Sequence, residues 1–464
     1  MGEILEKIYQ MTAFSNIAAE PGFLIMYALA FVLLYLGIKK GYEPLLLVPI
    51  AFGVLIANFP GGDMGVLGAN GQGEIFRYLL DNGSWQTISL EGGVDSLNGI
   101  ANPELYKQVG QLFYNTTENP LLNDASVMNN LKVYEVYEMS LPAIAHELGL
   151  MNFIYYMLIK TGFIPPIIFM GVGALTDFGP MLRNLKLAIF GAGAQFGIFA
   201  VLLIAAASGF FTMQEAASLS IIGGADGPTA IYTTIKLAPH LLGPIAIAAY
   251  SYMALVPVIV PLVVKLTCSK KELSINMKEQ DKLYPSKQEF KNMRVLKILF
   301  PIVTTVIVAI LVPTAVSLVG MLMFGNLIKE IGSSTNRIHD AASNGIMNAA
   351  TIFLGLSVGA TMTVDAFLNF QTIGIVIGGF FAFGFSIFGG IMLVKLFNLF
   401  SKKKINPLVG ATGLSAVPMA SRVANEIALK YDPKNHVLNY CMSSNVSGVI
   451  GSAVAAGILI SFLG

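Results

Sequence analysis

Two aspartates lie next to helix-breaking residues within apolar segments. Asp177 is in Gly-Ala-Leu-Thr-Asp-Phe-Gly-Pro (173–180), and Asp226 is in Gly-Ala-Asp-Gly-Pro (224–228). A carboxylate at membrane depth is costly and points to a functional site. It can supply the negative charge of a sodium site whose other ligands are neutral oxygens. Both also have a structural explanation: Asp177 could be an N-cap or boundary aspartate at the cytoplasmic surface near Arg183, and Asp-Gly-Pro favours a turn.

A further polar group lies in INPLVGATGLSAVPMASR, residues 405–422, between two long apolar segments. Its glycines and prolines interrupt a helix and let backbones approach closely. Interrupted backbone at membrane depth is tolerated only where it is buried in protein or lines a polar cavity. We therefore predict a substrate or ion site here. The neutral oxygens for sodium would come from Asn348, Asn406, Ser415 and Asn445.

Arg422 closes this stretch. An arginine can hold a carboxylate with two parallel hydrogen bonds, so Arg422 is a candidate for binding an anionic substrate. Asp177 is its candidate partner when that substrate is absent. The alternative is a basic anchor at the cytoplasmic surface. Tyr250 and Tyr252 lie in a span that faces the core, where packing is the default role of a tyrosine.

The chain of 464 residues is 55% hydrophobic and only 12% charged, whereas soluble domains are nearer about 25% charged. Apolar runs longer than about 18 residues recur, so we predict an all-α polytopic membrane protein that binds no nucleic acid. Two cysteines and four histidines show no disulfide framework or transition-metal spacing; His146 and His339 are expected to be structural or loop residues. The first 20 residues predict a short interfacial helix and no cleaved signal peptide.

The apolar segments divide the chain into a scaffold and two halves of a core. Full spans are expected at Phe23–Ile38, Pro44–Asn58, Leu187–Phe211, Leu241–Val264, Leu296–Gly320, Thr372–Phe400 and Val437–Phe462, and broken segments at Phe163–Leu182, Ala216–Ile235, Ile346–Ala360 and Ile405–Arg422. The predicted units are 1–58 (interfacial helix and two scaffold spans), 59–140 (acidic insert), 141–264 (first core repeat), 265–297 (basic loop), 298–343 (scaffold spans and a polar connection) and 344–464 (second core repeat).

The charged loops predict an orientation. Loop 265–297 holds nine Lys or Arg against four acids, and such loops remain in the cytoplasm. Arg183 and the lysines at 402–404 should share that side. Segment 59–140 holds ten acids against three basic residues and should lie outside. It is too long for a plain connection, so it is either a small folded insert or a partner-binding loop.

The two halves of the core repeat in sequence. Residues 168–171 recur as 352–355, 196–199 as 385–388, and 224–228 as 413–418, all at offsets of 184 to 190 residues and in the same order. The third match pairs Asp226 with Ser415. The basic-residue bias makes the repeats inverted, and inverted repeats with paired broken helices predict a transporter core whose site lies where the repeats meet.

Six motifs together resemble the beta subunit of the biotin-dependent, sodium-translocating decarboxylases, the family of the oxaloacetate, methylmalonyl-CoA, glutaconyl-CoA and malonate enzymes. They are GALTDFGP (173–180), IGGADGPT (222–229), TIFLGLSVGA (351–360), NPLVG (406–410), GLSAVPMASRV (413–423) and NVSGVIGS (445–452). The resemblance covers the first two spans and the chain from about Phe163 onward. Segment 59–140 is longer than the family pattern leads us to expect.

This resemblance implies the membrane subunit of a sodium pump, which decarboxylates carboxybiotin, exports sodium and consumes a proton. The family's functional positions fall on Asp177 for sodium binding and coupling, on Asn406, Gly410, Ser415 and Asn445 for sodium binding, and on Arg422 for carboxybiotin. A tyrosine also takes part in the family, and its candidates here are Tyr232, Tyr250 and Tyr252. Asp226 and Asn348 are further candidate site residues.

The resemblance also implies partners. Carboxybiotin would arrive from the cytoplasm on a biotin carrier subunit and would not be attached covalently to this chain. A carboxyltransferase subunit and a small single-span membrane subunit would complete the complex around a homotrimer of this chain, in a bacterial-type inner membrane. The parent acid is selected on another polypeptide, so this sequence does not indicate it.

Two other function classes remain open on the residues alone. One is a sodium-coupled carboxylate symporter without chemistry, in which Arg422 binds a free substrate. The other is a membrane scaffold that transports nothing, for which Asp177→Asn and Arg422→Ala would leave coupled activity unchanged.

Overall fold

The computed structural model describes residues 12–13, 16–17, 20–41, 43–62, 64–66, 74–79, 85–90, 136–138, 140–285, 292–368, 370–416 and 419–464. Its apolar body is built from helices, which confirms the predicted all-α class. The predicted interfacial helix at the start of the chain lies almost entirely outside the described residues. So does most of segment 59–140.

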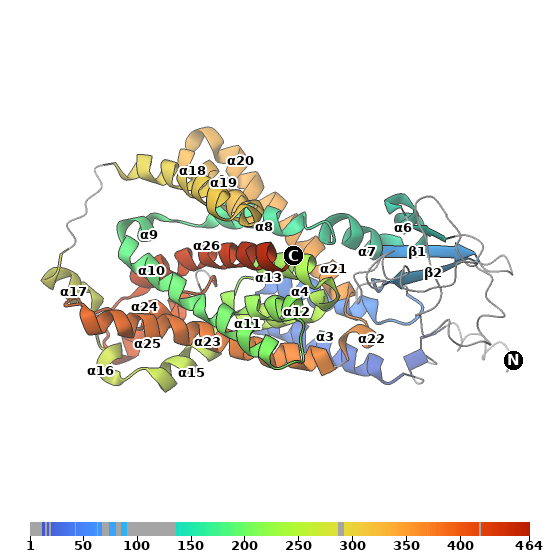
Figure 1. Ribbon diagram of the computed structural model, residues 1–464, viewed down its shortest axis with the longest axis horizontal. Coiled ribbons are helices and arrows are strands. Elements are labelled where there is room, and N and C mark those ends of the chain that lie inside the picture. Colours follow the sequence, from blue (N-terminus) through green and yellow to red (C-terminus); the bar gives the residue numbers. More distant parts are fainter. Residues whose placement is uncertain are drawn as a thin grey trace.

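The first part of the chain forms two apolar helices and three short strands. The helices are α3 (Gly22–Lys39) and α4 (Pro44–Ala57). Strand β1 (Glu74–Leu79) pairs antiparallel with β2 (Trp85–Leu90) and with β3 (Val136–Glu138), in the order β2-β1-β3. The strands lie within the predicted acidic insert, at one end of the molecule (Figure 1).

The first half of the core follows. Its helices are α6 (Leu141–Glu147), α7 (Gly149–Ile154) continued by a π-helical turn (Tyr155–Ile159), α8 (Ile164–Leu175), α9 (Gly179–Arg183), α10 (Leu185–Ala194), α11 (Phe196–Ala207), α12 (Met213–Ser220), α13 (Gly227–Leu237), α14 (Leu242–Ala254) and α15 (Val256–Thr267). The break predicted near Asp177 separates α8 from α9, and the break predicted at Gly227-Pro228 separates α12 from α13.

The second half begins after two short helices of the basic loop, α16 (Lys270–Leu273) and α17 (Met277–Leu283). It holds α18 (Met293–Leu311), α19 (Val316–Ile331), α20 (Asn336–Asp340), α21 (Met347–Ala360), α22 (Val364–Phe367), α23 (Phe370–Phe400), α24 (Leu408–Ala411), α25 (Met419–Tyr431) and α26 (Leu438–Leu463). The break predicted in residues 405–422 separates α24 from α25.

Three of the predicted segments differ in the structure. The expected span Leu241–Val264 is bent by 69° between α14 and α15, where Pro257 occupies the first turn of the new helix. The expected span Leu296–Gly320 is a hairpin: α18 ends at Leu311 and α19 returns after Pro313. A proline ends or bends a helix because it lacks the backbone N–H.

The third correction concerns residues 332–360. We predicted a polar connection around 332–344 followed by a broken segment. The structure instead forms α20, a π-helical turn (Ala341–Ile346) and an uninterrupted α21, which together run as one apolar helical segment, Ser333–Ala360. The wider π-helical turn holds Asn344 and Gly345 without ending the helix.

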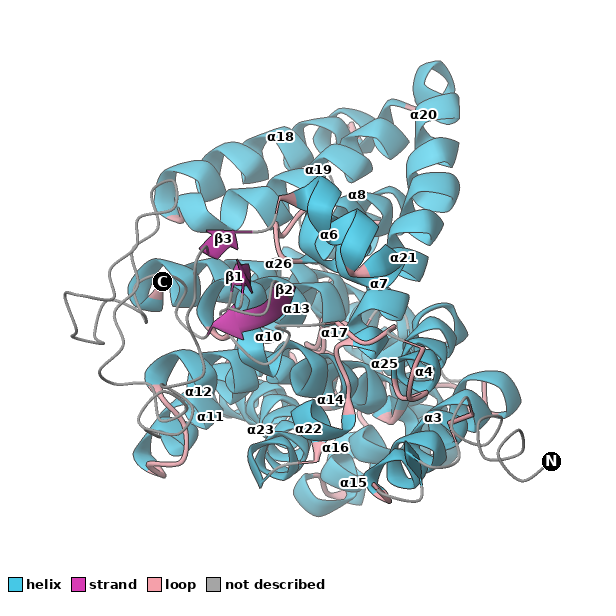
Figure 2. Ribbon diagram, turned by 90° about the vertical axis from the view of Figure 1, so that its right-hand side faces the viewer, coloured by secondary structure: helices cyan, strands magenta, loops and turns pink. Residues whose placement is uncertain are grey.

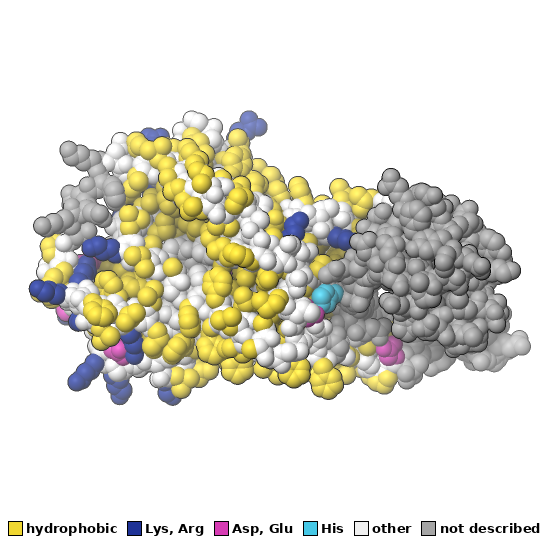
Figure 3. All heavy atoms as spheres, in the orientation of Figure 1, with side chains coloured by type: hydrophobic (Ala, Val, Ile, Leu, Met, Phe, Trp, Pro, Cys, Tyr) yellow, Lys and Arg dark blue, Asp and Glu magenta, His cyan; other side chains and the backbone are white. Residues whose placement is uncertain are grey.

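The apolar helices are long enough to cross a bilayer. Within the described residues, seven helices meet this length and composition, and two bent pairs raise the number to nine at most. Hydrophobic side chains cover the middle of the body, whereas Lys and Arg gather at the end where α16 and α17 lie (Figure 3). Lys403 there binds Asp281 at 2.6 Å, so the two basic loops share one side of the molecule. We call this side the basic end.

The interior has two apolar clusters. The larger one joins α10–α15 with α23–α26, and the second joins α3, α4, α7, α8, α14 and α21. In both ribbon views, α18, α19 and α20 form a separate layer along one side of the body (Figures 1 and 2). The breaks α12–α13 and α24–α25 thus lie within the larger cluster, surrounded by helices that hold them in place.

Candidate functional site

The two broken segments meet backbone to backbone. The Ser415 N–H, between α24 and α25, donates to the Gly224 carbonyl, between α12 and α13, at 2.9 Å. Gly224 is followed by Ala225 in the left-handed region with φ +55°, a conformation that residues with a side chain rarely adopt. This turn redirects the chain and brings the next residue, Asp226, to the crossing point.

Asp226 is the buried carboxylate of this crossing. Its side chain begins α13 by accepting from the Thr229 N–H at 3.2 Å. The other oxygen, Oδ2, accepts from Ser415 Oγ at 2.9 Å and from Ser452 Oγ at 3.0 Å. The residue is 6% exposed. A carboxylate held by two hydroxyls and a backbone N–H, with no ion-pair partner among the described residues, can take up a small cation or a proton.

Unpaired oxygens lie on the segments around Asp226. Thr229 Oγ1, Asn445 Oδ1 and the Tyr250 hydroxyl are buried and have no hydrogen-bond partner within the described residues. The Asn445 amide donates to the Leu414 carbonyl, next to Ser415. Buried polar atoms are normally paired, and neutral oxygens beside a carboxylate are the donor set that sodium requires.

Tyr250 packs directly on the start of α13. A side chain at Gly227 would place its Cβ 2.0 Å from Tyr250 Cε1, so only glycine leaves room for the ring. The ring is fully buried. Tyr250 therefore forms one wall of the Asp226 site and is the candidate tyrosine that the structure places there.

Asn406 and Gly410 lie elsewhere. The Asn406 amide donates to the Leu273 and Ile275 carbonyls at 2.9 and 3.0 Å, which ties the second broken segment to the basic loop. A Cβ at Gly410 would lie 2.1 Å from the Gly390 carbonyl oxygen, and the reverse holds for Gly390. In this conformation both residues position the second break, and neither contacts Asp226.

Asp177 lies at the basic end, away from the crossing. Its carboxylate is 51% exposed and binds Lys297 Nζ at 2.8 Å and the Gly179 N–H at 2.9 Å. Lys297 also lies 3.4 Å from Glu330. Asp177 borders a polar cavity of about 570 Å³, which Arg183, Lys278, Lys297, His436 and Tyr440 also line. The structure therefore does not bring Asp177 together with Ser415 and Asn445.

Lys297 lowers the pKa of Asp177. Partial burial raises the pKa of Asp177, but the hydrogen bonds from Lys297 and Gly179 and the nearby lysine charges outweigh it and hold that pKa below its ordinary value. Because the pKa of Asp177 is lower in the folded state, its ionised carboxylate stabilises the fold at pH values above its unfolded-state pKa near 3.8. This stabilisation is lost as the pH falls through its folded-state pKa.

We expect Lys297→Gln to lower the thermal stability of the purified chain at about pH 7 by a small amount, below about 1 kcal/mol for the Asp177 contact, because the pair is partly exposed. The difference from wild type should shrink as the pH falls below the unfolded-state pKa near 3.8 and through the lowered pKa of Asp177, where the carboxylate becomes protonated. Melting temperatures across this pH range measure it, with the exposed Lys186→Gln as control. An unchanged difference at every pH would contradict the assignment.

Arg422 lies on the exposed face of α25 and has no ion-pair partner within the described residues. The expected pair with Asp177 is not formed, because Lys297 binds that carboxylate. Asn425 follows Arg422 by three residues on the same helix face, and Asn425 lines the 570 Å³ cavity. Arg422 thus points to the same side of α25 as the cavity that Asp177 borders.

The remaining candidates face other elements. The Tyr232 hydroxyl accepts from Ser317 of α19 at 2.8 Å, and Tyr252 donates to the Val376 carbonyl of α23. Asn348 is exposed on α21. His339 contacts the Ala174 carbonyl at 3.1 Å, as expected for a structural residue; His146 is exposed on α6.

Sequence reasoning missed two features. Ser452, which binds Asp226, follows Asn445 by seven residues and so occupies the same face of α26; this spacing could have identified it. Glu215 joins His240 at 2.8 Å and Gln371 at 2.6 Å, at the end of α23 opposite the basic end. No local signal connects these three residues, which come together only in the folded chain.

Comparison with known proteins gives consistent matches. A family model described as the beta subunit of Na⁺-transporting oxaloacetate decarboxylase matches residues 22–463. The chain is 43% identical over 464 residues to the methylmalonyl-CoA decarboxylase subunit beta of Propionigenium modestum, covering 100% of both chains. It is 42% identical over 466 residues to the oxaloacetate decarboxylase beta chain 2 of Salmonella typhi, covering 99% of both. It is also 39% identical to the methylmalonyl-CoA decarboxylase subunit beta of Veillonella parvula over 458 residues, covering 97% and 98%.

Proposed function

The chain belongs to the family of Na⁺-transporting decarboxylase beta subunits, and we propose that it binds the transported sodium at Asp226 and decarboxylates carboxybiotin at its basic end. Membership of this family makes the chain the beta subunit of a sodium-transporting decarboxylase, and its apolar helices indicate a membrane protein. The observation that carries this proposal is the buried Asp226 carboxylate at the crossing of the two broken segments. It accepts from Ser415 and Ser452 and has no ion-pair partner within the described residues.

Sodium and a proton would compete for Asp226. Without the ion, the Ser415 and Ser452 hydroxyls donate to Oδ2. When sodium binds, these hydroxyls would rotate and turn their lone pairs toward the ion, and the buried oxygens of Thr229 and Asn445 would complete its shell. Protonation of the carboxylate removes the charge that retains sodium, so the ion leaves. One buried group can thereby exchange sodium for a proton.

Decarboxylation consumes that proton. In carboxybiotin the carboxylate is bonded to a ureido nitrogen; breaking the N–C bond releases CO₂ and leaves the electron pair on nitrogen, which takes up one proton. Moving one cation outward against about 100 mV costs about 2.3 kcal/mol. Sodium export therefore needs a driving reaction, and decarboxylation of carboxybiotin would supply it. Asp226 would take its proton from the far side and pass it on to the reaction.

We assign carboxybiotin to the basic end. The 570 Å³ cavity there is lined by Arg183, Lys278 and Lys297, and Arg422 lies on the same face of α25 as the lining residue Asn425. Arg422 has no ion-pair partner within the part of the chain that the structure describes, and an arginine can hold the carboxylate of carboxybiotin with two hydrogen bonds. Asp177 remains a proposed participant: it binds Lys297 at the cavity rim and would release that lysine when the substrate carboxylate arrives.

The proposed partners follow from the beta-subunit family. A beta subunit implies a multi-subunit complex, and we propose that a biotin carrier subunit delivers carboxybiotin, a carboxyltransferase subunit loads the carrier, and a small single-span subunit completes a homotrimer of this chain. The basic end, with its lysine-rich loops, would face the cytoplasm of a bacterial-type cell. The contact of Asp226 with Ser415, which match in the sequence repeat, supports an inverted-repeat core.

The assembled complex in inverted vesicles tests this function. We expect addition of the parent acid outside the vesicles to drive sodium inward together with CO₂ release, and avidin, which blocks biotin, to stop both. Uptake of sodium with a free carboxylate by this chain alone, insensitive to avidin, would instead indicate a symporter. Complexes lacking this chain serve as the control.

A further inference from the structure

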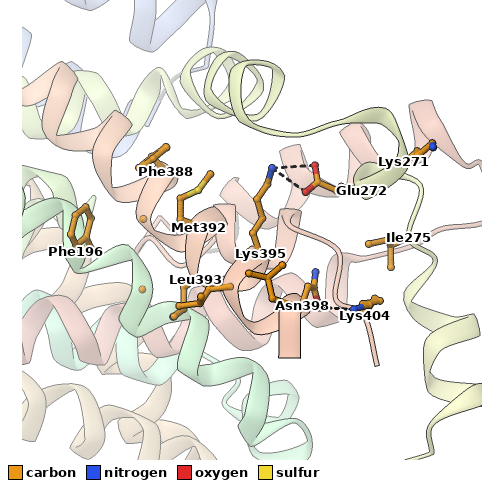
Figure 4. A pocket seen from close by; sticks show the side chains of 14 residues that line it. Phe196, Lys271, Glu272, Ile275, Phe388, Met392, Leu393, Lys395, Asn398 and Lys404 are labelled. Atoms are coloured by element: carbon orange, nitrogen blue, oxygen red, sulfur yellow. Dashed lines mark hydrogen bonds and ion pairs between the residues drawn. The ribbon is translucent and has the colours of Figure 1, made fainter. Parts of the chain in front are cut away.

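A groove opens on the side of the body at the basic end (Figure 4). Its volume is about 910 Å³. It lies between the α10–α11 junction, the second half of α23 and the segment around α16. None of its lining residues belongs to the Asp226 site or to the polar cavity that Asp177 borders.

One end of the groove is apolar. Phe196, Phe388, Met392 and Leu393 line it (Figure 4). Its floor is formed where α23 crosses the α10–α11 junction, and a Cβ at Gly389 would lie 2.7 Å from the Gly193 carbonyl oxygen. Since a bulkier residue does not fit there, the two helices approach closely and leave a furrow between the flanking side chains.

The other end is cationic. Lys395 projects from α23 and is fixed by Glu272 at 3.0 Å and by the Thr267 carbonyl at 2.6 Å. Lys271 and Lys404 are exposed on either side and form no ion pair within the described residues. Figure 4 shows both at the end of the groove that is farthest from the phenylalanines. Three lysines against one glutamate leave this end with a net positive charge.

We propose that the groove binds an anionic glycerophospholipid of the leaflet on the basic side, with its phosphate at Lys271 and Lys404 and an acyl chain along Phe388 and Met392. Basic pockets between membrane helices on the side of the basic loops suit such headgroups. An apolar furrow that leads away from the cations matches the chemistry of a lipid, in which an anionic head is joined to an apolar tail.

The length of the groove favours a lipid over a polypeptide. Its lining on α23 runs from Phe388 to Leu399, which at about 1.5 Å per residue is roughly 17 Å. This is close to half of the hydrocarbon core, which is about 30 Å thick. A single-span helix from a partner would need a surface across the full thickness, whereas a lipid occupies one leaflet.

The lipid would support the sodium site indirectly. Glu272 and Ile275 belong to the segment that the Asn406 amide holds through the Leu273 and Ile275 carbonyls. A headgroup bound at Lys271 would therefore stabilise the segment that fixes the second break. We expect bound anionic lipid to raise the thermal stability of the chain.

Native mass spectrometry of the purified full chain, with added dioleoylphosphatidylglycerol or dioleoylphosphatidylcholine, tests the proposal. Wild type should retain the anionic lipid in preference to the zwitterionic one, and Lys271→Ala with Lys404→Ala should weaken that retention at least about tenfold. Lys270→Ala with Lys402→Ala, exposed lysines outside the groove lining, is the matched control and should behave as wild type. Glycerol 3-phosphate alone should not bind, which separates a lipid from a free phosphate.

A second variant tests the apolar half. Met392→Trp fills the furrow and keeps all three lysines, and it should also lose the lipid. Equal retention by the lysine variant and the control would overturn the proposal. So would a cysteine at Met392 that, in the assembled complex, cross-links to another subunit and remains shielded from lipid, because a polypeptide would then occupy the groove.

Discussion

Asp226→Asn is expected to abolish sodium-dependent decarboxylation by the assembled complex. The substitution keeps the shape of the side chain but removes the negative charge that Ser415 and Ser452 contact at the crossing of the two broken segments. Removing one partner of a buried charge pair costs about 3–5 kcal/mol. This corresponds to roughly 10²- to 4 × 10³-fold weaker sodium binding, at about 1.4 kcal/mol per factor of ten.

The variant should remain folded. Asparagine begins helices as well as aspartate does, so α13 keeps its first hydrogen bond, from Thr229. The sodium dependence of CO₂ release measures the effect, and gel filtration verifies assembly. Ser415→Ala, which removes one neutral ligand, should show a smaller loss, near fivefold, as expected for about 1 kcal/mol per hydrogen bond. An Asp226→Asn complex with wild-type sodium dependence would contradict the assignment.

Gly390→Ala is expected to destabilise the protein and to weaken sodium binding. The added Cβ would lie 2.1 Å from the Gly410 carbonyl oxygen, a backbone atom that cannot move without displacing α24. Overpacking of this kind costs about 1–3 kcal/mol, and sometimes more. Because α24 leads directly into the second break, its displacement should also disturb Ser415 at the crossing.

The same helix offers a matched control. Gly384 also lies in α23, but a Cβ there meets nothing within 4 Å. Gly384→Ala should therefore be neutral or stabilise the helix by up to about 1 kcal/mol. Thermal unfolding of both variants in detergent, with sodium titrations of their activity, compares them. Equal melting temperatures for the two variants would mean that the contact between α23 and α24 is not tight.

The sequence predicted the breaks because glycine and proline act locally. The interruptions between α8 and α9, between α12 and α13 and between α24 and α25 all follow from such residues, and Asp226 contacts Ser415, its match in the sequence repeat. The bend at Leu255 and the hairpin at Pro313 were missed because proline permits either a bend or a continuing helix. Tertiary packing decides between these outcomes.

The choice between the two aspartates could not be made from local sequence. Asp177 and Asp226 both stand beside glycine and proline in apolar surroundings. They differ in burial and partners: Asp177 is half exposed and binds Lys297, 120 residues away, whereas Asp226 is buried and binds Ser415 and Ser452. The residues next to each aspartate in the sequence do not indicate such long-range contacts. Asn406 likewise carries a polar amide that the fold uses to hold a loop.

Sodium uptake into inverted vesicles during decarboxylation tests the central claim most directly, with wild type, Asp226→Asn and Asp177→Asn compared in parallel and assembly verified for each. We predict that wild type accumulates sodium and that Asp226→Asn loses both uptake and turnover. Asp177→Asn should still accumulate sodium, at a changed rate. Continued uptake by Asp226→Asn, together with its loss in Asp177→Asn, would contradict the account and place the ion site at Asp177.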